Sequence, residues 1–119
     1  MRAQAAVDAT GKVHIVYQNA KMRGELLYAT HDARKGSFSE PIPVLQDAKA
    51  MAAGFNMTVS PKGRVHVITR PNPQYSKLVM GDEAFQTMFQ SKQRFFDLRY
   101  MLHSRLNDAG TAFEKETNL

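Results

Sequence analysis

The phrase Gly11-Lys12-Val13-His14-Ile15-Val16 returns, with conservative changes, as Gly63-Arg64-Val65-His66-Val67-Ile68. The two copies lie 52 residues apart in the chain. In each copy a glycine that suits a turn precedes a run of β-branched residues, which is the pattern of a turn leading into a strand. Self-similarity at a fixed spacing is the sequence signature of a repeat architecture. We therefore expect one structural unit to occur twice.

The first unit has the pattern of four strands joined by turns. The strands are expected at residues 3–8, 13–17, 25–30 and 38–45. Pro41 and Pro43 place the fourth strand at a sheet edge, because proline has no N–H to donate to a ladder. An antiparallel meander of four strands and about 45 residues has the size of one β-propeller blade.

The second unit repeats this order with one long insertion. Its strands are expected at residues 55–60, 65–69, 98–104 and 113–119. Phe38 and Phe113, which begin the fourth strands, lie 75 residues apart rather than 52, so about 23 extra residues separate the second strand from the third. The insertion, with the connection it replaces, spans residues 70–96. Its second half predicts a helix, with Asp82 as the N-cap and phenylalanines on one face.

These assignments predict a mainly all-β fold class, with two four-stranded antiparallel propeller-type blades and an inserted helix in the second. Residues 1–47 would form the first blade and residues 48–119 the second, with the helical insert at about residues 70–96.

The composition excludes several classes of protein. Hydrophobic residues make up 43% of the chain and charged residues 23%, which argues against disorder, and the absence of cysteine excludes disulfides and thiolate metal sites. No apolar run reaches the roughly 20 residues of a transmembrane helix, so no membrane partner is expected. The first residues lack the apolar stretch of a signal peptide, so the chain as written is expected in the cytoplasm. The net charge of +5 accompanies no nucleic-acid-binding motif, which disfavours that partner.

His14 and His66 occupy equivalent positions in the repeat, which raises the question of a metal site. Equivalent residues of neighbouring blades are related by a rotation rather than brought together, and no further ligand keeps a metal-binding spacing with them. We expect both histidines to be structural hydrogen-bonding groups. Because a Gly-rich phosphate loop is also absent, neither a metal nor a cofactor is expected.

Two turns carry a recognisable signature. The stretch Thr30-His31-Asp32-Ala33-Arg34-Lys35-Gly36-Ser37-Phe38 resembles a stretched Asp box, and Asn107-Asp108-Ala109-Gly110-Thr111-Ala112-Phe113 is closer to the usual form of this motif. With the stretches 8–17, 36–44 and 104–114, they make the chain resemble part of a sialidase-like (Asp-box, or BNR-repeat) bacterial β-propeller protein.

Within the Asp boxes we expect structural roles rather than catalysis. The aspartate would accept backbone N–H bonds, the glycine would adopt the left-handed conformation, and the aromatic ring would be buried between the strands. The residues concerned are Asp32, Gly36, Phe38, Asp108, Gly110 and Phe113.

The resemblance implies sialidase chemistry only in part. Sialidases have six blades and hold their substrate with an arginine triad, a Tyr and Glu pair and an acid/base Asp. No motif in this chain places a residue in those roles, so no catalytic residue is assigned. Contacts to a ligand are expected instead where chain segments reach the axis of the propeller. The candidate ligand-binding residues are Lys49, Met51, Asn56, Tyr17, Arg70 and Arg105.

Three functions follow, in this order of preference. The first is a non-enzymatic, sialidase-like propeller module that self-assembles and binds glycans. The second is a glycoside hydrolase whose site is completed at subunit junctions. The third is a basic α+β protein that binds nucleic acid through residues 91–105.

Assembly is expected because two blades leave one uncovered sheet face at each end. Contiguous apolar faces of this kind mark interaction sites. Head-to-tail contacts between copies would close by rotation, and a homotrimer is favoured over a dimer because three copies complete a six-bladed ring.

Overall fold

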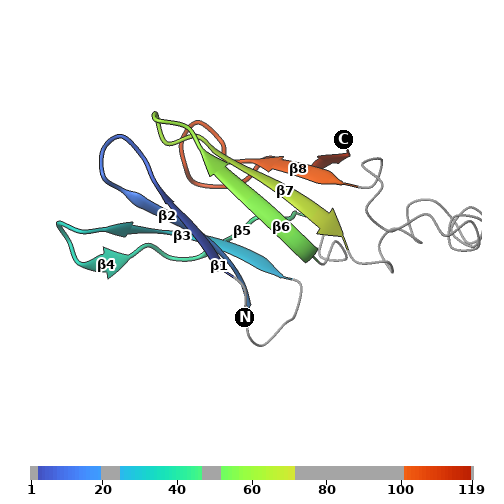
Figure 1. Ribbon diagram of the computed structural model, residues 1–119, viewed down its shortest axis with the longest axis horizontal. Coiled ribbons are helices and arrows are strands. Elements are labelled where there is room, and N and C mark those ends of the chain that lie inside the picture. The colour runs from blue at the N-terminus through green and yellow to red at the C-terminus, as the bar shows by residue number, and fades with distance from the viewer. Residues whose placement is uncertain (1–2, 20–24, 47–51, 72–100, 119) are drawn as a thin grey trace, which may run out of the picture.

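The computed structural model describes residues 3–19, 25–46, 52–71 and 101–118 (Figure 1). In this part of the chain every regular element is a strand, and the strands form two antiparallel sheets. The prediction of a mainly β, antiparallel chain is confirmed for these residues. The helix expected in the second half of the insertion lies outside them. The described part also holds no helix long and apolar enough to cross a membrane.

Sheet one contains β1 (Ala3–Val7), β2 (Val13–Gln18), β3 (Leu26–Asp32), β4 (Ser37–Phe38) and β5 (Ile42–Pro43). Strands β1 to β4 pair in chain order, and β5 pairs with β3 as well. The single fourth strand expected from the sequence is therefore divided in two: β4 pairs with β3 at His31, and β5 pairs with it at Tyr28. Pro41 lies between β4 and β5, where a residue without an N–H interrupts the ladder.

Sheet two contains β6 (Ala52–Val59), β7 (Val65–Pro71), β8 (Leu102–Arg105) and β9 (Thr117–Asn118), paired in that order. Strand β6 begins earlier than expected and carries a register shift between Ala52 and Gly54. The fourth strand is shorter than expected, and Phe113 joins the sheet through an isolated bridge to Leu106.

Equivalent strands pair with the same register in both sheets. In sheet one Val16 on β2 opposes Tyr28 on β3, and in sheet two Ile68 on β7 opposes His103 on β8. The β1–β2 pairing is likewise repeated by β6–β7 at the spacing of 52 residues. Strand β3 thus corresponds to β8 at a spacing of 75, as the insertion requires. The repeat in the sequence is therefore a repeat in the backbone pairing.

The first turn of each sheet is built in the same way. In sheet one the N–H of Asp8 donates to the carbonyl of Lys12 at 3.0 Å, and the N–H of Gly11 donates to the carbonyl of Asp8 at 3.0 Å. The residues 52 positions later repeat both bonds at 2.9 and 2.8 Å. Gly11 and Gly63 both have φ of 86°, a left-handed conformation that favours glycine. The glycine of the repeated phrase is thus required by the turn.

The main core lies between the two sheets. Its buried residues are Val16, Leu26, Tyr28 and Val44 from sheet one, with Val65, Val67, Leu106 and Phe113 from sheet two. A buried aliphatic or aromatic side chain of this size contributes roughly 1.5–3 kcal/mol. We call the two faces that meet here the inner faces, and the two faces that point away from the core the outer faces.

The two inner faces are not equivalent to each other. Val16 lies on the inner face of sheet one, whereas its counterpart Ile68 lies on the outer face of sheet two, one residue from the buried Val67. Val65 lies on the inner face of sheet two, and its counterpart Val13 lies on the outer face of sheet one. Because successive side chains of a strand alternate between faces, every residue on the inner face of one sheet has its counterpart on the outer face of the other. The sheets therefore stack front to back.

The outer faces differ in character. The outer face of sheet one is mainly apolar, with Ala5, Val7, Val13, Ile15, Tyr17, Leu27, Ala29 and Phe38, and His31 is its polar member. Val7 is 63% exposed and Phe38 is 65% exposed, so the described residues leave this part of the face uncovered. The outer face of sheet two is more polar, and it includes Asn56, Thr58, His66, Ile68, Arg70, His103 and Arg105.

Two hydroxyl groups in the core of sheet two lack partners. The side chains of Thr69 and Ser104 are fully buried, and neither hydroxyl has a hydrogen-bond partner among the described residues. The residue of sheet one that corresponds to Ser104 is Ala29, which is also buried. A buried hydroxyl without a partner destabilises the folded state, because its desolvation is not compensated.

We therefore expect Ser104→Ala to raise the free energy of unfolding by about 1 kcal/mol. Urea denaturation followed by circular dichroism measures this change. Ser39→Ala is the matched control, because the Ser39 hydroxyl accepts the N–H of Thr30 at 2.9 Å. The control should instead lower the free energy of unfolding by about 0.5–1 kcal/mol. A destabilised Ser104→Ala variant would contradict the prediction.

Candidate functional site

Gln4 joins the two sheets through its side-chain amide. Its Nε2 donates to the carbonyl of Phe55 at 2.9 Å, and its Oε1 accepts the N–H of Met57 at 2.9 Å. A neighbouring strand would pair with β6 through a backbone N–H and a backbone carbonyl. The Gln4 amide supplies an N–H and a carbonyl in the same way, so it replaces one residue of such a strand. Strands β1 and β6, the first strands of the two sheets, are thereby tied together across the junction (Figure 1).

Asp8, His14 and Tyr28 form a hydrogen-bonded row on the inner face of sheet one. The Nε2 of His14 lies 2.7 Å from Oδ2 of Asp8, and its Nδ1 lies 2.7 Å from the hydroxyl of Tyr28. Burial first, and then the charge of Asp8, raises the pKa of Tyr28 to about 12. Because a carboxylate only accepts hydrogen bonds, the Nε2–H of His14 donates to Asp8, and in the neutral imidazole Nδ1 accepts the hydroxyl of Tyr28.

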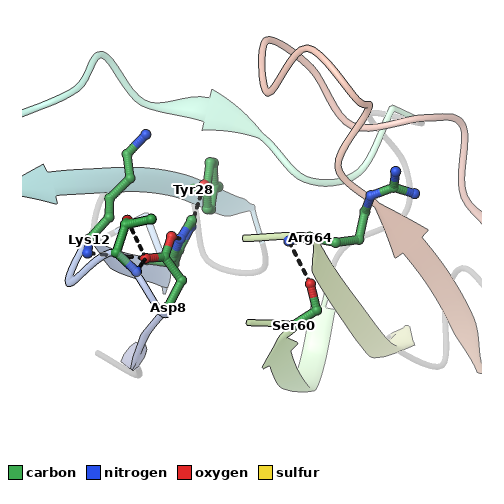
Figure 2. A network of polar contacts seen from close by, with 7 residues as sticks. Asp8, Lys12, Tyr28, Ser60 and Arg64 are labelled. Atoms are coloured by element: carbon green, nitrogen blue, oxygen red, sulfur yellow. Dashed lines mark hydrogen bonds and ion pairs between the residues drawn. The ribbon is translucent and has the colours of Figure 1, made fainter. Parts of the chain in front are cut away.

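The Asp8 carboxylate also closes its own turn. Its Oδ1 accepts the hydroxyl of Thr10 at 2.6 Å, the N–H of Thr10 at 2.8 Å and the N–H of Lys12 at 3.2 Å. The bond from the Thr10 hydroxyl, followed by the bond from His14, holds the pKa of Asp8 well below its usual range. Figure 2 shows Asp8 beside Lys12, and Ser60 in the matching place of the second turn, where it accepts the N–H of Arg64 at 2.9 Å.

The turn between β6 and β7 covers this row. A Cβ placed on Gly63 would lie 3.2 Å from Oδ2 of Asp8 and 3.9 Å from ring atoms of His14. Beside it, the N–H of Ala9 donates to the carbonyl of Pro61 at 3.2 Å. Gly63 therefore serves a second purpose, because its missing side chain lets the two turns pack together.

Sheet two carries the counterpart of this row on its outer face. The residues that take the three places, in order, are Ser60, His66 and His103. The Nδ1 of His66 lies 3.0 Å from Nε2 of His103, and the two rings are stacked with centroids 5.2 Å apart. Burial first, and then His103 with the neighbouring arginines 105 and 64, lowers the pKa of His66. Both rows are thus histidine-centred, but only one is covered.

A further tie between the sheets follows β5. The side-chain amide of Gln46 donates to the carbonyl of Phe113. The backbone N–H of Gln46 donates to Oε2 of Glu116 at 2.8 Å. The ring of Phe113 meets Tyr28 edge-on, with centroids 5.4 Å apart. The last strand of sheet one is thus held against the end of sheet two.

Two ion pairs lie on the outside of sheet two. Arg64 pairs with Asp108, and Arg105 pairs with both carboxylate oxygens of Glu114, with bonds of 2.8 and 2.9 Å. The second pair raises the pKa of Arg105 and lowers the pKa of Glu114. Exposed pairs of this kind contribute little to stability, because solvent screens the attraction between the charges. They neutralise part of the basic charge on this face.

The first predicted Asp box has the expected turn. The Oδ1 of Asp32 accepts the N–H of Arg34 at 2.9 Å, and the carbonyl of Asp32 accepts the N–H of Gly36 at 2.8 Å. Gly36 has φ of 65°, in the left-handed region. Phe38, however, is exposed rather than buried between strands, because its side chain lies on the uncovered outer face of sheet one.

The second predicted Asp box corrects one assignment. Asn107, not Asp108, organises this turn: its Oδ1 accepts the N–H of Thr111 at 2.9 Å, and its carbonyl accepts the N–H of Gly110 at 3.0 Å. The side chain of Asp108 points outward and is 87% exposed. Gly110 has φ of 71°, and Phe113 is fully packed in the core. The capping position is therefore one residue earlier than the sequence indicated.

The predicted ligand-binding residues are brought together only in part. Asn56, Arg70 and Arg105 lie on the outer face of sheet two, whereas Tyr17 lies on the outer face of sheet one. The two remaining candidates, Lys49 and Met51, lie outside the described residues. Three of the four described candidates thus share one face, and Tyr17 lies at the opposite end of the stack.

The covered row has the hydrogen-bond order of a catalytic relay, in which a hydroxyl, a histidine and a carboxylate follow one another. Its hydroxyl belongs to Tyr28, which is only 4% exposed and is shielded by Phe113. Within the described residues no group of three His, Cys, Asp or Glu side chains has the arrangement of a metal site. The row lies at the junction between the sheets, where it packs against the turn between β6 and β7.

Sequence reasoning identified the two histidines but missed their partners and the Gln4 bridge. No local motif marks Gln4 or Tyr28, because each acts across a strand pairing or a sheet junction. The signal that was present is the repeat itself: the residue 52 positions after Gln4 is Asn56, which is also an amide. Aligning the two units position by position would have singled out this pair.

Comparison with protein-family models, with characterised proteins and with solved structures finds no match to this chain.

The Asp8 carboxylate predicts a stability loss in acid. Because its pKa is lowered in the folded state, the carboxylate stabilises the fold above the ordinary value of 3.8, and this contribution is lost as the pH falls through the folded-state pKa. We expect Asp8→Asn to be less stable than the wild type at pH 7 and to lose less stability in acid. Urea denaturation at pH 7 and at pH 3 measures both effects.

Thr10→Ala serves as the graded comparison, because it removes the hydroxyl that contributes most to the shift of Asp8. Its acid sensitivity should lie between those of the wild type and Asp8→Asn. If Asp8→Asn lost as much stability in acid as the wild type, another group would control the acid transition.

Proposed function

We propose that the chain is a non-enzymatic, propeller-type module that self-assembles head to tail, with each sheet acting as one blade. One observation carries this proposal: the two sheets stack front to back, so that each end of the stack presents the face that the other end lacks. A contact between unlike faces can be repeated by further copies, and such heterologous contacts give rings when the rotation closes.

The apolar outer face of sheet one supports assembly. Val7 and Phe38 are large, apolar and mostly exposed. Their counterparts in sheet two are Val59, which packs against the core, and Phe113, which is buried in it. An apolar sheet face left in water is a mark of an interaction site. The inner face of sheet two is thus covered within the chain, whereas the corresponding outer face of sheet one is left open.

The burial of Tyr28 favours a structural over an enzymatic role for the row of Asp8, His14 and Tyr28. A substrate would have to displace Phe113 from the core to reach the phenol. The ligand class attached to the proposal is a glycan, as the family resemblance implies. A glycan array probed with the assembled protein tests this part separately from assembly.

The proposal predicts a specific size in solution. Light scattering on a sizing column should give a homo-oligomer, and a ring of three 13.4 kDa chains would have a mass of about 40 kDa. The thermal midpoint should also rise with protein concentration, because association stabilises the folded chain. A mass of one chain at all concentrations would contradict self-assembly.

A further inference from the structure

We infer that the outer face of sheet one docks on the outer face of sheet two of a second copy, with the Asn56 amide bridging to the edge of β1 in that copy. The docking rests on the proposed self-assembly and specifies its contacts. Its template is the junction within the chain, where the amide bridge, the turn packing and several apolar residues have counterparts at the open ends.

The amide bridge provides the first element. Within the chain Gln4 binds the carbonyl of Phe55 and the N–H of Met57 on the edge of β6. The counterpart of Gln4 is Asn56, whose side chain is exposed on the outer face of sheet two. Within the chain the Oδ1 of Asn56 accepts a hydrogen bond from Nε2 of Gln4 at 3.2 Å, which leaves the Asn56 amide N–H groups and the second lone pair of Oδ1 for the bridge. The counterparts of the two bound backbone groups are the carbonyl of Ala3 and the N–H of Ala5.

These backbone groups lie on β1, which is an edge strand of sheet one. Asparagine presents the same donor and acceptor as glutamine on a side chain one methylene shorter. The amide of Asn56 therefore has the chemistry to repeat the bridge, provided that the two strands approach more closely than β1 and β6 do within the chain.

The turns provide the second element. Within the chain Gly63 packs on Asp8 and His14, where a Cβ would meet the carboxylate at 3.2 Å. The counterpart of Gly63 is Gly11, which has the same φ of 86°. Around Gly11 a Cβ would meet no atom within 4 Å. In the docked pair this open space would receive the row of Ser60, His66 and His103 from the second copy.

The apolar residues provide the third element. Part of the outer face of sheet one matches the inner face of sheet two that is already covered in the chain. The matched apolar pairs are Val7 with Val59, Val13 with Val65, Ile15 with Val67, Leu27 with Leu102, and Phe38 with Phe113. Elsewhere the two faces differ: Ala5 corresponds to Met57, Tyr17 to Thr69 and His31 to Leu106. Within the chain, the inner face of sheet two packs on the inner face of sheet one. The open outer face of sheet one should therefore receive the face that corresponds to it, which is the outer face of sheet two in a second copy.

Some bonds of the template have no counterpart. Within the chain the N–H of Ala9 donates to the carbonyl of Pro61. The matching bond would need an N–H from Pro61, and proline has none. The two bonds that Gln46 makes to the end of sheet two are also not repeated by any described residue. The contact between copies thus has fewer hydrogen bonds than the contact within the chain, so copies should separate before the two sheets do.

A mixing experiment tests which faces meet. Val7→Glu places a charge on the outer face of sheet one, and Thr58→Glu places one on the outer face of sheet two; both side chains are exposed, so the fold should be kept. Each variant alone should be a monomer by light scattering. The two together should form a one-to-one dimer, because each retains the face that the other needs. Lys35→Glu, in the exposed turn before β4, is the charge control and should assemble like the wild type.

The outcomes separate this docking from the proposed function. A wild type that stays monomeric overturns self-assembly and the docking with it. A wild type that assembles, while the mixed variants stay monomeric, leaves self-assembly in place but overturns the pairing of these two faces. Circular dichroism of each variant confirms that a monomer is folded.

A second pair of variants tests the amide bridge. Asn56→Ala should weaken association about 30-fold, since two hydrogen bonds per contact are lost. Asn56→Gln should associate at least as tightly as the wild type, because glutamine already makes this bridge at position 4. Sedimentation velocity over a concentration series measures both dissociation constants. An Asn56→Ala variant that associates as tightly as the wild type would overturn the bridge.

Discussion

Each sheet of this protein has two faces, and the alternation of side chains along a strand decides what each face carries. In sheet one both faces are apolar: Val16 and Tyr28 lie on the inner side, and Val7 and Phe38 lie on the outer side. A sheet that is apolar on both sides must be covered twice to remove that surface from water. Sheet two covers one side. The core and the junction form where sheet two covers the inner face of sheet one. The outer face of sheet one is the open end, because the described residues leave it uncovered.

Burial of apolar area brings the two sheets together, but it does not set how they align. Alignment comes from polar groups placed at the edges of the apolar layer. Gln4 fixes β1 against β6, the row of Asp8 and His14 packs under Gly63, and Gln46 ties the far edge to Phe113. Buried polar groups with satisfied bonds favour one arrangement over others of similar apolar area. The junction is therefore specific as well as stable.

Much of the fold could be predicted because its determinants are local. The turn glycines and the β-branched runs after them placed β2 and β7 closely. The prolines indicated an edge strand, but not that this strand divides into β4 and β5. The exposed Phe38 and the buried Phe113 could not be told apart in this way, since the difference depends on which face of which sheet is covered. Asn107 and Asp108 are adjacent and chemically similar, so only the backbone geometry decides which one caps the turn.

The site was less predictable than the fold because it consists of contacts between residues far apart in sequence. His14 was recognised as a hydrogen-bonding group, yet its partner Tyr28 lies one strand away, and Gln4 acts on a strand about 50 residues later. Long-range partners of this kind leave no spacing pattern. The repeat was the one sequence feature that carried information about them, since it relates several residues of the covered junction to residues at the open ends.

We propose that one kind of junction, seen once within the chain, is repeated between chains. A crystal or electron cryomicroscopy structure of the assembled protein tests it most directly. The contact between chains should repeat the pairing of faces seen between the two sheets, in a cyclic arrangement with Asn56 of one chain at the edge of β1 of the next and the two strands closer together than β1 and β6. An arrangement in which the outer face of sheet one packs on the same face of a second copy, about a two-fold axis, would contradict it.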